Sequence, residues 1–165
     1  MSRKFTILIL ACWIISGCGF QPLYGERKHN SVVTEFSSVY VAPIKDRIGQ
    51  QLRNELLHQL HASNQKNRAK YKLVATLREG RQALAVRKSA FATRANLTVT
   101  ATFDLIAEGD DTPVLSATEK ATVSYNILDM EFATLAAQRD AQERAIKSLG
   151  KDIVVRLAVF FNRQK

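Results

Sequence analysis

The residue with the clearest chemistry in this sequence is Cys18, a thiol that follows a long apolar run. Two cations, Arg3 and Lys4, precede an uncharged apolar stretch of 11 residues from Phe5 to Ile15. A positive flank, a short apolar run and small residues at its end are typical of a secretory signal peptide. The run is shorter than the ~20 apolar residues that a permanent membrane-spanning helix needs. Because a thiol with small neighbours at the membrane surface can accept a lipid, we predict covalent lipid attachment at Cys18.

The segment Ile15-Ser16-Gly17-Cys18 resembles the lipobox of bacterial lipoproteins more than an ordinary A-x-A cleavage site. The resemblance implies cleavage before the cysteine and a mature N-terminus that carries three acyl chains. One chain gives only reversible membrane binding, whereas several anchor a protein stably. Inner-membrane lipoproteins often carry Asp after the cysteine; Gly19 stands here, which implies the outer membrane. The alternative is a plain signal peptide with a chance cysteine.

Composition predicts one compact domain after the signal peptide. The chain has 165 residues, and removal of 1–17 leaves enough for a single hydrophobic core. Cys12 leaves with the signal peptide and Cys18 is the anchor, so the sequence holds no cysteine for a disulfide. The formal net charge of +9 favours an anionic partner, either phosphate-bearing lipid or an acidic protein surface, or simply solubility. Nucleic acid is a poor candidate because the sequence has no recognition motif for it.

The residue patterns that support catalysis or cofactor binding are missing from the sequence. His58 and His61 could share a metal only with further ligands, and His29 lies far from them along the chain. The seven glycines are scattered, so the sequence has no phosphate-cradling loop. We therefore predict that the protein is not an enzyme and that it uses no cofactor and no metal.

Apolar periodicity predicts how the mature chain is organised. We expect a lipidated tether over 18–31 and a single domain over 32–165. A first strand is expected over 37–42, followed by an amphipathic helix over 46–61 with Asp46 as its N-cap. The apolar stripe of this helix consists of Ile48, Leu52, Leu56 and Leu60.

Alternation with a period of two predicts three further strands. One long bent strand begins at Tyr71, and a change of parity around Gly80 indicates a bulge or a tight turn. The clearest alternation runs over 96–105, and a turn over 109–113 leads to a return strand. The last element is a helix over 134–161.

The element order β-α-β-β-β-α predicts an α+β fold. The first β-α-β step needs a crossover and gives a parallel pair, whereas the later strands are antiparallel. We expect a two-layer sandwich with two helices on one face of a four-stranded mixed sheet. The other face carries short hydroxyl side chains, namely Thr98, Thr100, Thr102, Ser116, Thr118 and Thr122.

A basic cluster lies in the middle of the chain and consists of Arg78, Arg81, Arg87, Lys88 and Arg94. On a bent strand and its loop these cations would form one edge patch that can meet lipid phosphates, for which arginine offers a bidentate fork. The alternative is a solvated strand end whose cations discourage edge pairing.

Four segments of the chain, in the right order, resemble the LPS-assembly lipoprotein family LptE of the alphaproteobacterial type. They are Cys18–Gly25, Asp46–Leu56, Ala92–Leu97 and Ser124–Asp129. The resemblance implies two helices on a four-stranded sheet, in agreement with the element order. It also implies an outer-membrane lipoprotein that sits in the lumen of the LptD β-barrel. There it would support assembly of the barrel and help to deliver lipopolysaccharide to the outer leaflet.

Two hypotheses of our own follow for the site residues. Barrel interiors are polar, so the hydroxyl face would lie against one without burying an unpaired charge. The alternative is a plain solvent face of an antiparallel sheet. The basic cluster is the candidate for lipopolysaccharide contact. A second class of function is a periplasmic carrier of lipid or of a small apolar ligand, which would need a cavity inside the domain.

Overall fold

The computed structural model describes residues 35–62, 69–86 and 92–164. All of them belong to one compact unit. The predicted signal peptide, Cys18 and the tether lie outside the described residues, as do Arg87 and Lys88. Within the described residues, no helix is both long enough and apolar enough to cross a membrane.

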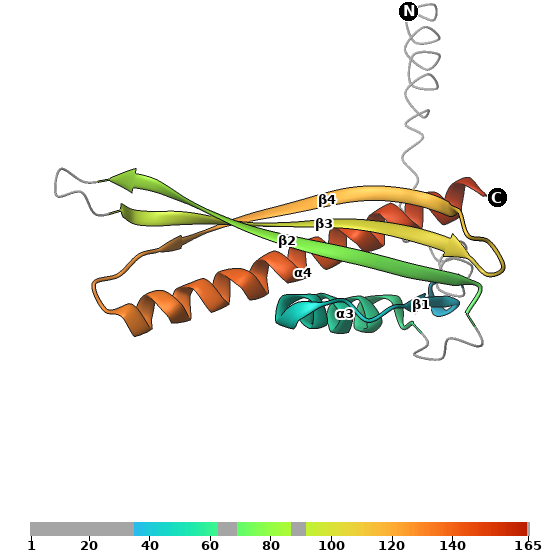
Figure 1. Cartoon of the computed structure of the whole chain (residues 1–165), viewed down its shortest axis with the longest axis horizontal. Helices are drawn as coiled ribbons and strands as arrows, with labels where there is room; N and C mark the ends of the chain where they lie inside the picture. Colours follow the sequence, from blue (N-terminus) through green and yellow to red (C-terminus); the bar gives the residue numbers. More distant parts are fainter. Residues whose placement is uncertain (1–34, 63–68, 87–91, 165) are drawn as a thin grey trace, which may run out of the picture. The chain divides into compact units, whose positions relative to one another are not determined.

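Four strands form one mixed sheet in the order β1-β2-β3-β4 (Figure 1). The strands are β1 Val39–Val41, β2 Tyr71–Val86, β3 Ala92–Ala107 and β4 Pro113–Asn126. β1 runs parallel to β2, and the two later pairs are antiparallel. The helices α3, Asp46–Leu60, and α4, Glu131–Arg163, lie on the same face of the sheet (Figure 1). The predicted α+β fold and its β-α-β-β-β-α order are confirmed.

The hydrophobic core lies between the sheet and the two helices. Alternate residues of β3 face the helices because successive side chains of a strand point to opposite faces. From Leu97 to Leu105 these odd-numbered side chains are at most 1 % exposed. They meet the apolar stripes of α3 and α4, which consist of Leu52, Leu56, Leu60, Leu149, Ile153 and Leu157.

The start of α3 differs from the prediction in two respects. Asp46 is the first residue of the helix, and the N-cap position is held by Lys45 without a side-chain cap; the prediction of Asp46 as the cap is wrong. Gly49 is buried, whereas Ile48 is half-buried. Ile44 fills the space beside the helix, since a Cβ at Gly49 would lie 2.7 Å from Ile44 Cγ2.

β2 is one continuous strand of 16 residues, as predicted. Its register runs unbroken through Gly80, which pairs with Thr98, and the irregularities lie between Ala83 and Val86. The predicted bulge or turn at Gly80 is therefore wrong. Figure 1 shows α3 beneath only the half of β2 that adjoins β1. Beyond it both faces of β2 are exposed from Gly80 to Leu84, so burial no longer dictates the alternation of residue types.

α4 is 33 residues long and extends past both ends of the helix predicted over 134–161. Its solvent side carries the i,i+4 ion pairs Asp140–Arg144 and Glu143–Lys147, of the kind that supports exposed helices. The pKa of Lys147 lies above its ordinary value, chiefly because its ammonium donates a hydrogen bond to Glu143 and is attracted by that carboxylate.

Candidate functional site

The sheet face opposite the helices carries a ladder of paired hydroxyl groups. Thr98 Oγ1 lies 3.0 Å from Thr122 Oγ1, and Thr102 Oγ1 lies 3.3 Å from Thr118 Oγ1. Pairs of this kind follow from the register, because residues opposite each other on neighbouring strands share a face. The structure thus brings the predicted hydroxyl residues together on one surface, which we call the hydroxyl face.

Two further pairs extend the hydroxyl face toward its ends. Ser116 donates a 2.5 Å hydrogen bond to Asp104 Oδ1, and Ser124 donates one of 2.7 Å to Asn96 Oδ1. The polar groups of this face therefore bond to one another. A partner can cover such groups at a low desolvation cost, because they keep a hydrogen-bond partner after water has left.

The hydroxyl face also carries more positive than negative charge. The ladder pairs Arg78 with Thr100 and Thr100 with Lys120, so these residues form one row across β2, β3 and β4. We call this row the cationic row. The side chains of Arg78 and Lys120 form no ion pair and no hydrogen bond with any residue in the described part of the chain.

The described members of the predicted basic cluster, Arg78, Arg81 and Arg94, do not all share one face of the sheet. Arg78 and Arg94 lie on the hydroxyl face, where both are exposed. Arg81 pairs with Leu97 in the register and so lies on the helix side of the sheet. Its guanidinium forms an ion pair with Glu79 at 3.0 Å.

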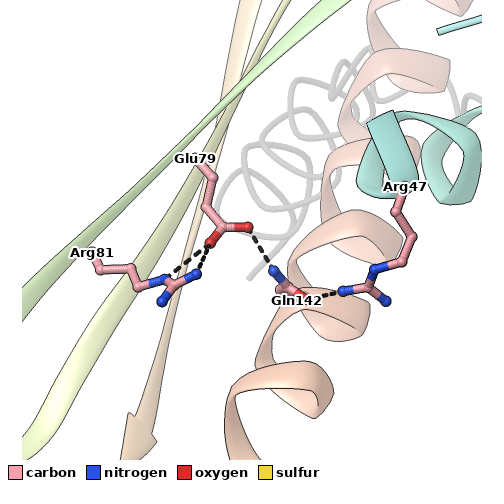
Figure 2. A network of polar contacts seen from close by, with 4 residues as sticks. All are labelled: Arg47, Glu79, Arg81 and Gln142. Carbon is pink, nitrogen blue, oxygen red and sulfur yellow. Dashed lines mark hydrogen bonds and ion pairs between the residues drawn. The ribbon is translucent and has the colours of Figure 1, made fainter. Parts of the chain in front are cut away.

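A polar network joins three elements on the helix side of the sheet (Figure 2). Gln142 of α4 is 6 % exposed; its Nε2 donates a 2.7 Å hydrogen bond to Glu79 Oε2 of β2. Its Oε1 accepts a 2.8 Å hydrogen bond from Arg47 of α3. Figure 2 shows these groups in a chain that continues to Arg81. Sequence reasoning missed this network, although its signal is Glu79, a charge that follows the inward series Leu73, Ala75 and Leu77.

Exposed apolar side chains gather where β4 passes into α4. The corner exposes Leu128, Met130, Phe132 and Leu135, with Phe132 at 85 %. Thr134 Oγ1 holds the corner, since it accepts a hydrogen bond from Leu128 N at 2.9 Å and donates one to Leu128 O at 3.0 Å. The sequence analysis did not find this corner because it placed the start of the helix at 134.

Two cavities lined by described residues open at the surface of the domain. One, of about 270 Å³, lies at the end of the sheet between Tyr40, Tyr71 and the acidic turn Glu108–Asp111. The other, of about 250 Å³, lies beside Glu119 and Arg156. Neither lies within the core between the layers, where a carrier would hold an apolar ligand. Within the described residues, no group of His, Cys, Asp or Glu side chains is arranged to hold a metal ion.

The fold and this site define a class of protein, namely a small α+β domain whose helices cover one face of the sheet and leave a polar face uncovered. The sequence pattern of the LptE family, described as lipopolysaccharide-assembly, matches residues 36–157. The chain belongs to this family, which confirms the resemblance found in the sequence.

Solved structures of lipoproteins share the fold. A putative lipoprotein from Caulobacter crescentus CB15 is 28 % identical, with a TM-score of 0.66, over 81 % of this chain and 97 % of that chain. A minor lipoprotein from Acinetobacter baumannii is 21 % identical, with a TM-score of 0.55, over 77 % of this chain and 95 % of that chain. Lipoprotein B from Nitrosomonas europaea is 16 % identical, with a TM-score of 0.57, over 75 % of this chain and 83 % of that chain. The last two show the fold alone. No curated protein sequence matches the chain.

Proposed function

We propose that this chain is a lipid-anchored outer-membrane protein that partners an LptD-type β-barrel. In this role it supports assembly of the barrel and helps to deliver lipopolysaccharide to the outer leaflet, and its own side chains catalyse no reaction. Membership of the lipopolysaccharide-assembly family supports the general role. The observation that carries the partnership is the hydroxyl face, a broad polar surface that α3 and α4 leave uncovered.

The hydroxyl face suits the lumen of a barrel for a physical reason. The inner walls of outer-membrane barrels are polar, so an apolar face would gain little from docking there. Hydroxyls that already bond across the strands, such as Thr98 with Thr122, can be covered without orphaned hydrogen-bonding groups. The candidate barrel-facing residues are Thr98, Thr100, Thr102, Ser116, Thr118 and Thr122.

The experiment is recovery of the barrel with a tagged, full-length chain from detergent-extracted membranes. Replacement of both Thr100 and Thr118 by leucine should lower barrel recovery, because the leucines place apolar bulk against a polar wall. The matched control is Ser148→Leu, which alters an exposed position of α4. Undiminished recovery with the double variant would overturn the assignment of this face.

Lipid attachment at Cys18 is the second part of the proposal. The lipoprotein name of the Caulobacter crescentus relative supports it, as does the apolar run before the cysteine. Cys18→Ala should leave the protein without acyl groups by mass spectrometry and should release it from the outer-membrane fraction. A wild-type protein that carries no acyl group would refute the anchor.

Lipopolysaccharide contact is the third part of the proposal. Arg94 is exposed on the hydroxyl face at the end of the sheet, and the sequence places Arg87 and Lys88 in the connection that precedes β3. Charge reversal at Arg87 and Lys88 should lower binding of lipopolysaccharide by the purified protein; equal binding would remove them from the site. The carrier alternative is disfavoured because packed side chains, among them Leu52, Leu97 and Leu149, fill the core between the layers.

A further inference from the structure

The cationic row spans the middle of the hydroxyl face. Arg78 lies on β2 and Lys120 on β4, and Thr100 of β3 stands between them in the register. Neighbouring strands lie about 4.8 Å apart, so the backbones of the two cations lie about 10 Å apart. Both long side chains can therefore reach the space above Thr100, or each can meet its own anion on an opposing surface.

The two faces of the sheet differ in whether their cations are paired with carboxylates. On the helix side, Arg81 pairs with Glu79 and Arg156 pairs with Glu119. On the hydroxyl face, the cations of β2, β3 and β4 are Lys72, Arg78, Arg94 and Lys120, and the carboxylate is Asp104. Asp104 already accepts a hydrogen bond from Ser116. The hydroxyl face therefore brings an excess of positive charge to whatever covers it.

We propose that the cationic row is a docking site for acidic side chains of the barrel wall, with one carboxylate for Arg78 and one for Lys120. This inference rests on the proposed function, in which the hydroxyl face meets the barrel. Burial of two cations against a wall without anions would carry a large desolvation penalty for each ion. Carboxylates opposite the row remove that cost, and the Arg78 fork can bind one of them through two parallel hydrogen bonds.

The surroundings of the row favour protein carboxylates over lipid phosphates. A lipid would need apolar surface for its acyl chains beside the cations, and the neighbours of the row are Thr76, Thr98, Thr102 and Thr122. The large exposed apolar side chains of β2 and β4, Leu84 and Val114, lie at register shifts near the ends of their strands, away from the row. Gly80, beside the row, has no heavy atom within 4 Å of a Cβ built on it, which leaves room for a partner backbone.

The test uses the full-length chain co-expressed with the LptD-type barrel of the same bacterium. Arg78→Glu with Lys120→Glu should lower the recovered barrel about tenfold or more, since close interfacial charge pairs contribute at least about that factor. Arg78→Lys with Lys120→Arg should retain most recovery. Arg139→Glu with Lys151→Glu, exposed cations of α4, is the matched control and should change little. Thermal unfolding of each purified variant checks that the domain is folded.

The outcomes distinguish carboxylates of the barrel from lipid phosphates as the ligands of the cationic row. Barrel variants with Asp or Glu replaced by Lys that restore recovery of the charge-reversed chain would establish the pairs. If charge reversal has no effect while Thr100→Leu with Thr118→Leu abolishes recovery, the inference is wrong and the proposed function stands. If the wild type recovers no barrel, both fail. If charge reversal abolishes binding to vesicles of phosphatidylethanolamine and lipopolysaccharide but leaves barrel recovery intact, the ligand is a phosphate and the inference is overturned.

Discussion

Gln142 and Glu79 lie far apart in the sequence, yet a 2.7 Å hydrogen bond joins their side chains between α4 and β2 (Figure 2). The bond lies on the helix side of the sheet, near the start of α3, whose Arg47 binds the other end of the same amide. On one side of this contact the sheet is covered by α3, and on the other side β2 is exposed from Gly80 to Leu84. The network therefore lies at the edge of the hydrophobic core, where coverage of β2 by α3 ends, and its polar groups are hydrogen-bonded there.

Removal of the amide should destabilise the domain. Gln142→Ala leaves Glu79 Oε2 and the Arg47 guanidinium without the partner that Gln142 supplies. We expect the free energy of unfolding to fall by about 1–3 kcal/mol, the cost of leaving a buried hydrogen-bonding group without its partner. The value should lie toward the lower end, because Glu79 keeps its ion pair with Arg81. Urea denaturation of the purified protein measures this change.

A second variant at the same position tests whether a neutral amide is needed beside the Glu79 carboxylate. Gln142→Glu places a carboxylate within hydrogen-bond distance of Glu79 Oε2, so it should destabilise the domain more than Gln142→Ala does. Gln138→Ala is the control, since Gln138 lies on the same helix and its side chain forms no hydrogen bond with a described residue. Equal stabilities of the alanine variant and the wild type would show that the network does not support the fold.

The helix and sheet layers could be predicted from the sequence because burial of one face of an element spaces its apolar residues regularly. The alternation of β3 and the stripe of α3 are read directly from residue types, since one face of each element is packed and the other is not. The hydroxyl face was found in the same way, because Thr98 and Thr122 occupy the outward positions of strands whose other face is clearly apolar.

Two predictions failed in parts of the sheet where both faces are exposed, because burial there does not determine which residue types face each side. The parity change was assigned to a backbone irregularity at Gly80, but the register shifts lie further along β2, between Ala83 and Val86. Both faces of β2 are exposed from Gly80 to Leu84, so residue types there do not show where the register shifts. The basic cluster was treated as one patch, yet Arg81 and Arg78 lie on opposite faces of β2. Only the register decides which cations share a face, and a shift by one residue exchanges the faces.

Replacement of Gly150 by alanine should not stabilise the protein, although alanine usually stabilises a helix relative to glycine. Alanine is favoured over glycine by roughly 1 kcal/mol in a helix interior, but a Cβ at this position would lie 2.8 Å from Glu55 Cγ of α3. Gly150→Ala should therefore lower the melting temperature, because the Glu55 side chain must move and its 2.5 Å hydrogen bond from Gln59 is disturbed.

The double variant distinguishes this clash from helix propensity. With Glu55→Ala the obstructing atoms are gone, so the further change Gly150→Ala should stabilise the domain by up to about 1 kcal/mol. The coupling of the two substitutions in a double-mutant cycle should thus be favourable. Additive effects of the two changes would mean that α3 and α4 do not touch at these residues.

Thr134 should stabilise the apolar corner through its hydroxyl alone. Thr134→Val keeps the shape of the side chain but removes both hydrogen bonds to the backbone of Leu128. We expect a loss of about 1 kcal/mol in stability and faster amide hydrogen exchange at Leu128. Thr112→Val, at an exposed turn position, is the control. Unchanged exchange at Leu128 would contradict the bonding assigned to Thr134.

Substitution of Gly80 tests both the stability of the isolated domain and the proposed approach of the partner. A glycine inside a strand is destabilising by roughly 0.5–1 kcal/mol relative to alanine, and here the space above it is open. Gly80→Thr should therefore raise the free energy of unfolding of the isolated domain by about that amount, whereas Gly109→Thr should lower it because Gly109 has a φ of +89°. If a partner backbone approaches the hydroxyl face beside Arg78, the same Gly80→Thr variant should lose barrel recovery despite its greater stability. A variant that gains stability and binds as before would show that the partner leaves this part of the face uncovered.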